Sequence, residues 1–311
     1  MKSATEMHHA KHALRKEMGW HWGGKHTQNW HGLPRGILGI GFGVKRKKGK
    51  VVKEHCIRVY VREKPQERDL PRKHRVPRKI DGYFTDVIEV RAFRPHQGPG
   101  DSLSNAAGTS GTFTCVVKDK DGQYLLGSWH VLTNKTGQDG DPVFMPSRVA
   151  DPNAPAVADL IGTPNFHLNG GSDAFDASVA RIRDGVDINP QPQPGNSFGA
   201  VRAASLSLRV IKQGAATGRT TGTIDGLAED IVVTYNNQFA DRAVLTGQMF
   251  IAGDGGPFSA EGDSGAMVCT EDLCPVGMLV GGSVIQANVA GPHSFASPIQ
   301  PILDFYGVSI V

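Results

Sequence analysis

Short apolar runs separated by glycine- and proline-containing turns make up most of this chain. Apolar side chains alternate with glycines over 37–44, and a second apolar run follows at 56–61 after a lysine-rich turn. Two such runs around a short charged turn predict a β-hairpin. A third run at 83–90 predicts another strand, and residues 4–18 are compatible with one short helix.

The strand pattern resumes at Gly108 and continues to the end of the chain, interrupted once by the proline-rich segment 189–195. The two β-rich units have comparable lengths of about 80 and 110 residues, which favours two packed barrels. The predicted fold is therefore all-β. Its predicted divisions are a His- and Trp-rich arm (1–35), a basic β-rich appendage (36–95), a linker (96–107), a first barrel (108–188), a proline-rich linker (189–198) and a second barrel (199–311).

Charge is divided unevenly along the chain. Residues 1–95 hold 23 Lys and Arg against 9 Asp and Glu, a net charge of +14, whereas the remainder holds 11 against 21, a net charge of −10. A basic unit of this kind can dock on the acidic remainder or bind nucleic acid or anionic lipid. Because no nucleic-acid motif accompanies it, we expect docking and no nucleic-acid partner.

Other features of the sequence bear on the cellular location, the state of the cysteines and metal binding. No apolar run is long enough to cross a bilayer, and no hydrophobic segment follows Met1–His9, so we expect a cytoplasmic protein. The four cysteines lack zinc-site spacing, and we expect free thiols. Six histidines in residues 1–35 lack acidic partners at ligand spacing, which favours a flexible or docking arm over a metal site. We expect no metal and no cofactor.

The segment 261–268 is the strongest candidate for chemistry. Ser264 lies between two glycines and follows Asp263, and an apolar run begins directly after it. A serine on such a tight turn can act as a nucleophile beside backbone N–H groups that bind an oxyanion. A polar turn before a strand has the same appearance, so the serine needs a base and an orienting acid elsewhere in the chain.

Both can be found upstream. His130 is placed at the end of the apolar run 124–132, where a strand end would hold the ring at a barrel edge. Asp176 precedes a small-apolar alternation typical of a buried strand, where a carboxylate needs a hydrogen-bonding partner such as an imidazole. Asp173 is the competing acid. The chain order His130, Asp176, Ser264 is that of chymotrypsin-like enzymes.

The segments Ser128–Val131, Asp176–Ala180 and Gly262–Ala266 together make residues 108–311 resemble a trypsin/chymotrypsin-like (PA clan) serine peptidase. Residues 211–223 are also similar to the second-barrel opening of bacterial and plant members. The appendage, at 59–64 and 85–89, resembles plant narrow-leaf type proteases. Residues 1–35 are not covered by these similarities.

The resemblance implies two six-stranded antiparallel barrels and a serine endopeptidase with His130, Asp176 and Ser264 as its triad. The N–H groups of Gly262 and Ser264 would form the oxyanion hole. Phe258 would form the base of the substrate pocket, with Glu261 as the acid near it, and an apolar pocket base favours apolar substrates over Lys or Arg. Val280 and Gly281 would form the edge strand that pairs with the substrate backbone.

Two departures from the pattern matter. Residues 108–113 show no activation site, so we expect Asp263 to find a partner other than a new N-terminus. Trp129 and Ala266 replace residues more usual in relatives, and each leaves the catalytic groups in place.

The expected partner is a protein or peptide substrate, and a regulatory protein or a homo-oligomer is compatible with the separate appendage. The alternative is an inactive protease-fold scaffold that works through its basic N-terminal region.

Overall fold

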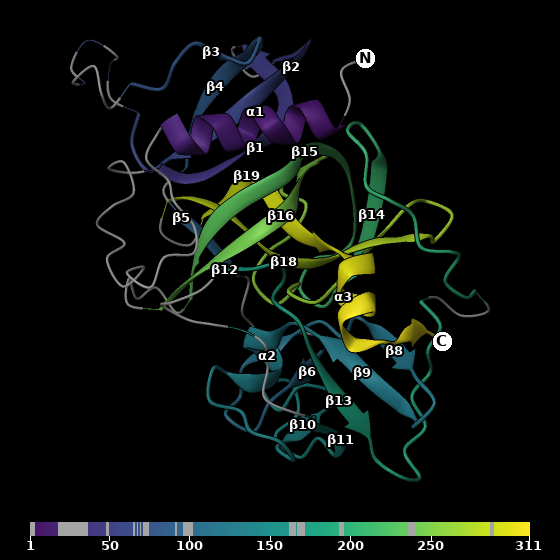
Figure 1. The fold of residues 1–311 in the computed structure, drawn as a ribbon. Helices are drawn as coiled ribbons and strands as arrows, with labels where there is room; N and C mark the ends of the chain where they lie inside the picture. Colours follow the sequence, from purple (N-terminus) through teal and green to yellow (C-terminus); the bar gives the residue numbers. More distant parts are fainter. Residues whose placement is uncertain are drawn as a thin grey trace.

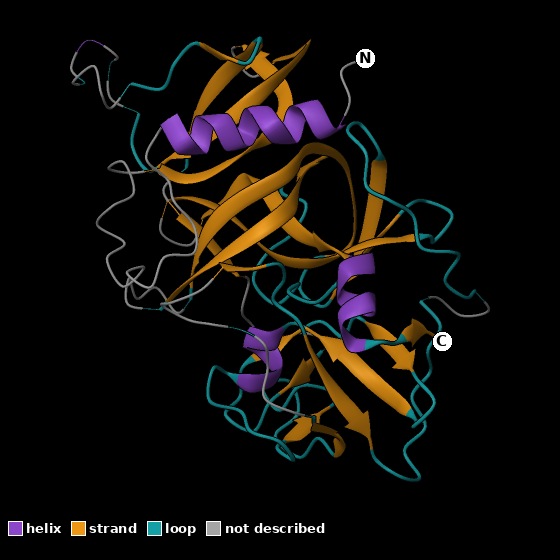
Figure 2. Ribbon diagram, viewed as in Figure 1, coloured by secondary structure: helices purple, strands orange, loops and turns teal. Residues whose placement is uncertain are grey.

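The computed structural model describes residues 4–17, 37–47, 50–64, 66, 68, 70, 75–90, 92–95, 102–161, 166, 172–192, 196–235, 241–286 and 289–311. Strands dominate these residues, and the prediction of an all-β fold is confirmed. Two sheets form two lobes, with the larger sheet above the smaller one in Figures 1 and 2.

The second half of the chain supplies a closed barrel of six strands. Neighbouring strands pair in the order β16, β19, β18, β17, β14, β15, and a further pairing of β15 with β16 closes the ring. Valine, isoleucine and phenylalanine alternate toward its interior, which suits strands whose inner face is buried. The strands are β14 (Arg209–Gly214), β15 (Gly218–Thr234), β16 (Arg242–Gly253), β17 (Met267–Cys269), β18 (Pro275–Gln286) and β19 (Val289–Pro298).

The smaller sheet comes mainly from the middle of the chain. Its order is β20, β8, β9, β13, β11, β10, β6, β7. The strands are β6 (Leu103–Ser104), β7 (Ser110–Gly111), β8 (Cys115–Lys118), β9 (Gln123–Gly127), β10 (Pro142–Phe144), β11 (Ala156–Leu160), β13 (Ser178–Ile182) and β20 (Ser309–Ile310). β6 lies inside the segment predicted as a linker, and β20 returns from the C-terminus after helix α3 (Ile299–Tyr306).

The appendage extends the sheet of the second barrel. β1 (Ile37–Lys47) and β2 (Lys50–Val61) form the predicted hairpin, and β1 pairs with β15 on its other edge. β4 (Tyr83–Glu89) runs parallel to β2, with β3 (Lys79–Ile80) beside it. The predicted N-terminal helix is α1 (Ala4–Glu17), which lies across β1 in Figure 1 and buries Ala10 and Leu14 against the hairpin.

Buried ion pairs join the basic N-terminal region to the barrel. Lys11 and Arg15 on α1 lie 3.1 and 3.0 Å from the carboxylate of Asp230 on β15. Arg58 on β2 is fully buried and lies 3.3 Å from Asp225, which, like Asp230, is on β15. These contacts confirm that part of the basic N-terminal charge docks on the acidic remainder of the chain.

Two short strands lie apart from this order. β12 (Ser172–Asp173) runs parallel to β16, and β5 (Ala92–Pro95) pairs with both β15 and β18. β5 belongs to the segment predicted as the appendage, yet it lies against strands of the second barrel. It therefore places the end of the appendage beside the barrel that carries Ser264.

The expectations about membrane spans, metal sites and the N-terminal arm can be compared with the described residues. Over the part of the chain that the structure describes, no helix has the length and apolar character needed to cross a membrane, and no three metal-ligating side chains gather. His8 and His12 contact each other on α1. Predictions for the rest of the arm, at 18–36, fall outside the described residues.

Candidate active site

His130 lies on a short helix and not at a strand end as predicted. Strand β9 ends at Gly127, and helix α2 (Trp129–Thr133) follows. The chain turns there because the backbone N–H of His130 donates to Asp176 Oδ1 at 3.0 Å, while the N–H groups of Val131 and Leu132 donate to the carbonyl of Ser128. The helix still places His130 at the edge of the smaller sheet.

Asp176 holds the imidazole through one hydrogen bond, and it accepts two more, from the backbone N–H of His130 and from the hydroxyl of Tyr235. It is fully buried just before β13, and its Oδ2 lies 2.5 Å from His130 Nδ1. Because a carboxylate only accepts, Nδ1 carries the proton and Nε2 is left for another partner. Tyr235 at the end of β15 donates its hydroxyl to the same Oδ2 at 2.9 Å. Asp176, and not Asp173, is thus the acid that contacts His130.

Aromatic packing fixes the tyrosine that sequence reasoning missed. Tyr235 is fully buried, its ring lies edge-on to Trp129 and Phe166, and those two rings stack with centroids 4.1 Å apart. Tyr235 comes from the second barrel and Trp129 from the first. Nothing in the local sequence around either residue marks this contact, since it joins segments about a hundred residues apart.

The Ser264 turn is held by threonines of the first barrel. Thr112 Oγ1 donates to the carbonyl of Gly262 at 2.8 Å, and its N–H donates to the carbonyl of Ser264 at 2.7 Å. Thr114 Oγ1 donates to the carbonyl of Gly265. Gly265 has a φ of +95°, and a Cβ there would lie 2.1 Å from a backbone oxygen, so only glycine fits.

Gly262, the predicted second oxyanion donor, also has a left-handed backbone, with a φ of +94°. Its carbonyl is fixed by Thr112, so the direction of the peptide that joins it to Asp263 is fixed as well. The N–H of that peptide belongs to Asp263 and donates to the carbonyl of Ala260, so the role of the Gly262 and Ser264 N–H groups as oxyanion donors stays a prediction.

Helix α2 and the serine turn meet at one glycine. A Cβ built on Gly111 would lie 2.5 Å from the Val131 side chain and 2.8 Å from the Ser264 carbonyl oxygen. Val131, the neighbour of His130, and the backbone of Ser264 therefore pack on the same residue of β7. This contact brings the first-barrel pair His130–Asp176 to the second-barrel serine.

The serine hydroxyl is turned toward strand β18 in this conformation. Ser264 Oγ donates to the carbonyl of Val280 at 2.9 Å. His130 Nε2 is buried and, among the described residues, accepts or donates no hydrogen bond. Ser264 Oγ and His130 Nε2 therefore do not hydrogen-bond to each other in this conformation.

Asp263 has an internal cation as its partner, as expected from the missing activation site. Lys212 Nζ lies 3.0 Å from Asp263 Oδ2, and both side chains are fully buried. The N–H groups of Ala216, Thr217 and Ala260 and the Thr217 hydroxyl also donate to this carboxylate. Burial opposes ionisation, but the Thr217 hydroxyl and the Lys212 charge outweigh it and lower the pKa of Asp263.

The pKa values of the two partners shift in the same direction. Burial lowers the pKa of Lys212, against the attraction of Asp263. The hydrogen bonds to Asp263 favour its ionised form, and the ammonium lies at contact distance from that carboxylate, so we treat the pair as ionised. Lys212 lies on β14, where it directly follows the buried Val210 and Ile211.

The predicted substrate positions lie in three different environments. Phe258 is fully buried in the core of the second barrel, so contact with a substrate would require this core to open, and its role as pocket base stays a prediction. Glu261 is exposed. Val280 and Gly281 lie on β18, where Gly281 is paired with Phe295 on one edge and with Pro95 of β5 on the other.

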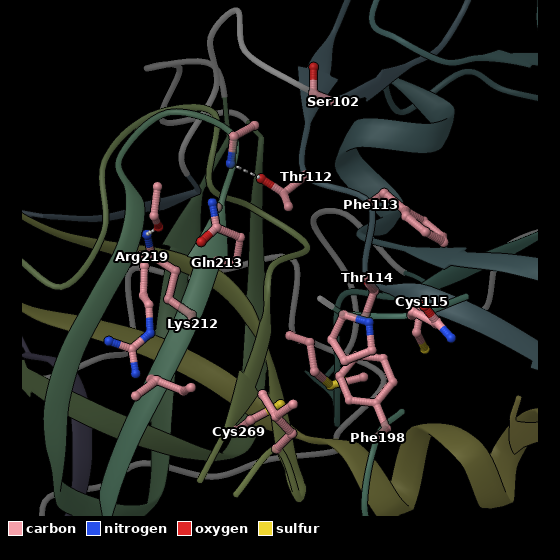
Figure 3. A pocket seen from close by; sticks show the side chains of 18 of the residues that line it. Ser102, Thr112, Phe113, Thr114, Cys115, Phe198, Lys212, Gln213, Arg219 and Cys269 are labelled. Atoms are coloured by element: carbon pink, nitrogen blue, oxygen red, sulfur yellow. Dashed lines mark hydrogen bonds between the residues drawn. The ribbon is translucent and has the colours of Figure 1, made fainter. Parts of the chain in front are cut away.

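A cavity of about 730 Å³ lies between the barrels on the far side of the serine turn. Lys212, Thr112 and Thr114 line it, and Figure 3 shows the Thr112 hydroxyl bonded to a backbone N–H of the opposite wall, that of Ala215. His130, Asp176 and Ser264 do not line it. The cavity therefore adjoins the supports of the turn and not the reacting groups.

All four cysteines are free, as predicted. Cys56, Cys115 and Cys269 are buried, whereas Cys274 is half-exposed. Cys269 and Cys274, which could have paired across a turn, each keep a thiol.

No protein family model and no curated protein matches the sequence. Solved structures similar to this chain include a glutamic acid specific serine protease, with a TM-score of 0.49, 17% identity, and coverage of 69% of this chain and 100% of that one. Thermobifida fusca protease A has a TM-score of 0.48, 18% identity, and coverage of 68% and 97%. Cellulomonas bogoriensis chymotrypsin has a TM-score of 0.47, 19% identity, and coverage of 68% and 97%.

Proposed function

We propose that the chain is a serine endopeptidase in which Ser264 is the nucleophile, His130 the general base and Asp176 the orienting acid. One observation carries the proposal: His130 Nδ1 is bound to a buried carboxylate at 2.5 Å, while its Nε2 is buried with no partner among the described residues. An imidazole held in this tautomer is prepared to accept a hydroxyl proton.

The chemistry follows from these positions. Ser264 Oγ rotates from Val280, transfers its proton to His130 Nε2 and attacks the substrate carbonyl carbon. The N–H groups of Gly262 and Ser264 bind the resulting oxyanion. The C–N bond then breaks as the imidazolium gives its proton to the leaving amine, and water hydrolyses the acyl-enzyme by the reverse sequence. Asp176 and Tyr235 keep the ring in place throughout.

The test is loss of turnover in a folded variant. Ser264→Ala is expected to unfold at the wild-type midpoint and to lose peptide hydrolysis by roughly 10⁶-fold. A fluorophosphonate should label the wild type and leave the variant unlabelled. Equal labelling of both chains would contradict the proposal and favour a catalytically weak or inactive scaffold. The same holds if neither the wild type nor a chain with β5 detached from β18 is labelled.

A further inference from the structure

One edge of strand β18 carries three different contacts in succession. Residues 275–278 pair with β17, and the ladder continues as Gly265 N–H donates to Leu279 and Leu279 N–H donates to Ala266. Ser264 Oγ then binds the carbonyl of Val280. From Gly281 to Val284 the same edge is paired with β5. The nucleophile thus lies between β17 and β5 along one strand edge.

We propose that β5 is an intramolecular occupant of the substrate-binding edge, which rests on the proposed function of Ser264. The predicted partner of an extended substrate backbone is β18 at Val280 and Gly281. β5 is antiparallel to it, with Pro95 opposite Gly281, Arg94 opposite Gly282 and Phe93 opposite Ser283. An added strand on a free sheet edge is how extended peptides bind, and here the chain itself supplies that strand.

The direction of β5 aims its C-terminal end at the nucleophile. The last paired residue of β5, Pro95, lies opposite Gly281, which directly follows Val280, and the Val280 carbonyl binds Ser264 Oγ. One strand residue spans about 3.3 Å, so the end of β5 lies about one residue from the level of the serine. On its other edge, β5 pairs with β15 at Val233, two residues before Tyr235. β5 is therefore bordered by supports of both Ser264 and Asp176.

The hydrogen-bonding pairs can be assigned from the chemistry of the strands. β18 is irregular between Leu279 and Gly281, and beyond that point backbone groups alternate in direction, so those of Gly281 and Gly282 face opposite edges. Pro95 has no N–H, which agrees with its pairing at a position that exchanges no hydrogen bonds. Arg94 and Gly282 are then the pair that exchanges both, and Phe93 and Ser283 form the closer, non-bonded pair.

The occupied edge means that the enzyme is held in a restrained state until β5 leaves. A substrate strand cannot pair with Gly282 while Arg94 does, so the apparent affinity for substrate falls by the fraction of molecules in which β5 is displaced. The Ser264 hydroxyl, turned to Val280 instead of His130, belongs to the same restrained conformation. The appendage that supplies β5 is anchored to the barrel by α1 and β1, which keeps β5 at a high local concentration.

The first experiment releases β5 in the full chain. Arg94→Pro removes the bonded N–H, and its matched control, Arg94→Ala, changes the same side chain but keeps that N–H. Turnover of a chromogenic peptide with an apolar residue before the scissile bond should rise about tenfold in Arg94→Pro, the effect of losing one or two net hydrogen bonds, and stay near wild type in Arg94→Ala. Equal turnover in all three folded chains would overturn the proposal, as would an equal rise in both variants.

A reversible lock covers the case in which the proline variant does not fold. Phe93→Cys with Ser283→Cys places two thiols at a close, non-bonded pair, where a disulfide can form. The oxidised chain should lose at least about tenfold in turnover and recover it on reduction, whereas Ser283→Cys alone should not respond. Full turnover in the oxidised chain, with the disulfide verified by mass spectrometry, would refute occupation of the edge.

Failure of this proposal can be told apart from failure of the proposed function. In the Ser264→Ala background, binding of a fluorescent peptide should still tighten about tenfold with Arg94→Pro, because strand pairing does not need the hydroxyl. Binding that tightens without any turnover in chains that carry Ser264 would refute the peptidase and support the occupied edge. Turnover with unchanged binding would do the reverse.

Discussion

The buried pair Lys212–Asp263 permits the most quantitative prediction. Lys212→Met keeps most of the side-chain volume but leaves a fully buried carboxylate without its cation, which lies 3.0 Å away in the wild type. Removing one partner of a buried pair typically costs about 3–5 kcal/mol of unfolding free energy. Asp263 keeps the N–H donors of Ala216, Thr217 and Ala260, so we expect a loss of about 3 kcal/mol.

The loss should depend on pH in a defined direction. Asp263 has a lowered pKa in the folded chain, so it contributes stability above its unfolded pKa of about 3.9, and that stability is lost as the pH falls through the folded value. Without Lys212 the folded pKa rises, so Asp263 stabilises the folded chain less at neutral pH and less of that stability is left to lose in acid. The difference between the two chains should be largest at neutral pH and shrink in acid.

Urea unfolding followed by tryptophan fluorescence at pH 7 and pH 4 measures both effects. Arg183→Met is the matched control, because Arg183 pairs with Asp159 at an exposed position, where loss of an ion pair costs less than about 1 kcal/mol. Adding Asp263→Asn to Lys212→Met should restore part of the stability. The reasoning is refuted if Lys212→Met is within 1 kcal/mol of the wild type at neutral pH, or if its loss is the same at both pH values.

Three further predictions follow from buried contacts. Tyr235→Phe removes a hydrogen bond to the Asp176 carboxylate and should lower kcat/KM about tenfold with KM little changed, measured on a chain already released from β5. Asp230→Asn weakens the partner of two buried cations on α1 and should make that helix sensitive to limited proteolysis at unchanged barrel stability; protection equal to wild type would show that apolar packing alone holds it. Of the four thiols, Ellman's reagent should modify Cys274 rapidly in the folded chain, because burial raises the pKa of Cys56 and Cys269 to about 12 and also raises that of Cys115. Four equally fast thiols would contradict this.

Features set by local pattern could be predicted from the sequence. The hairpin β1–β2 and helix α1 follow from short-range alternation and charge, and the Ser264 turn is marked by its two glycines. His130 was predicted at a strand end but lies on helix α2, because the hydrogen bond from its N–H to Asp176 converts the end of an apolar run into a helical turn. That bond joins residues 46 positions apart, which periodicity does not register.

Contacts between the barrels could not be predicted in the same way. Tyr235, Lys212 and Thr112 each support a catalytic position from a distant segment, and each lies in a stretch that reads as ordinary strand or turn. The placement of β5 was missed for a related reason. These four residues were placed at the end of the appendage, next to a glycine- and proline-rich segment, and their pairing with β18 depends on an edge that only the folded barrel provides.

The supports of the serine and the restraint on it come from different parts of the chain, and this separation has a physical consequence. Asp263 is held by Lys212 inside the barrel, so the turn is formed without any new N-terminus. Because the turn is already formed, the activity of Ser264 must be controlled in some other way than by forming the turn. An edge strand supplied by the appendage can provide this control. Its few backbone hydrogen bonds are weak enough for a substrate strand to replace them, yet the tether keeps β5 close enough to exclude most substrate strands. Control by strand exchange would leave Asp176 and His130 paired in both states, so β5 and the Ser264 rotamer are the elements expected to differ between the restrained and the active chain.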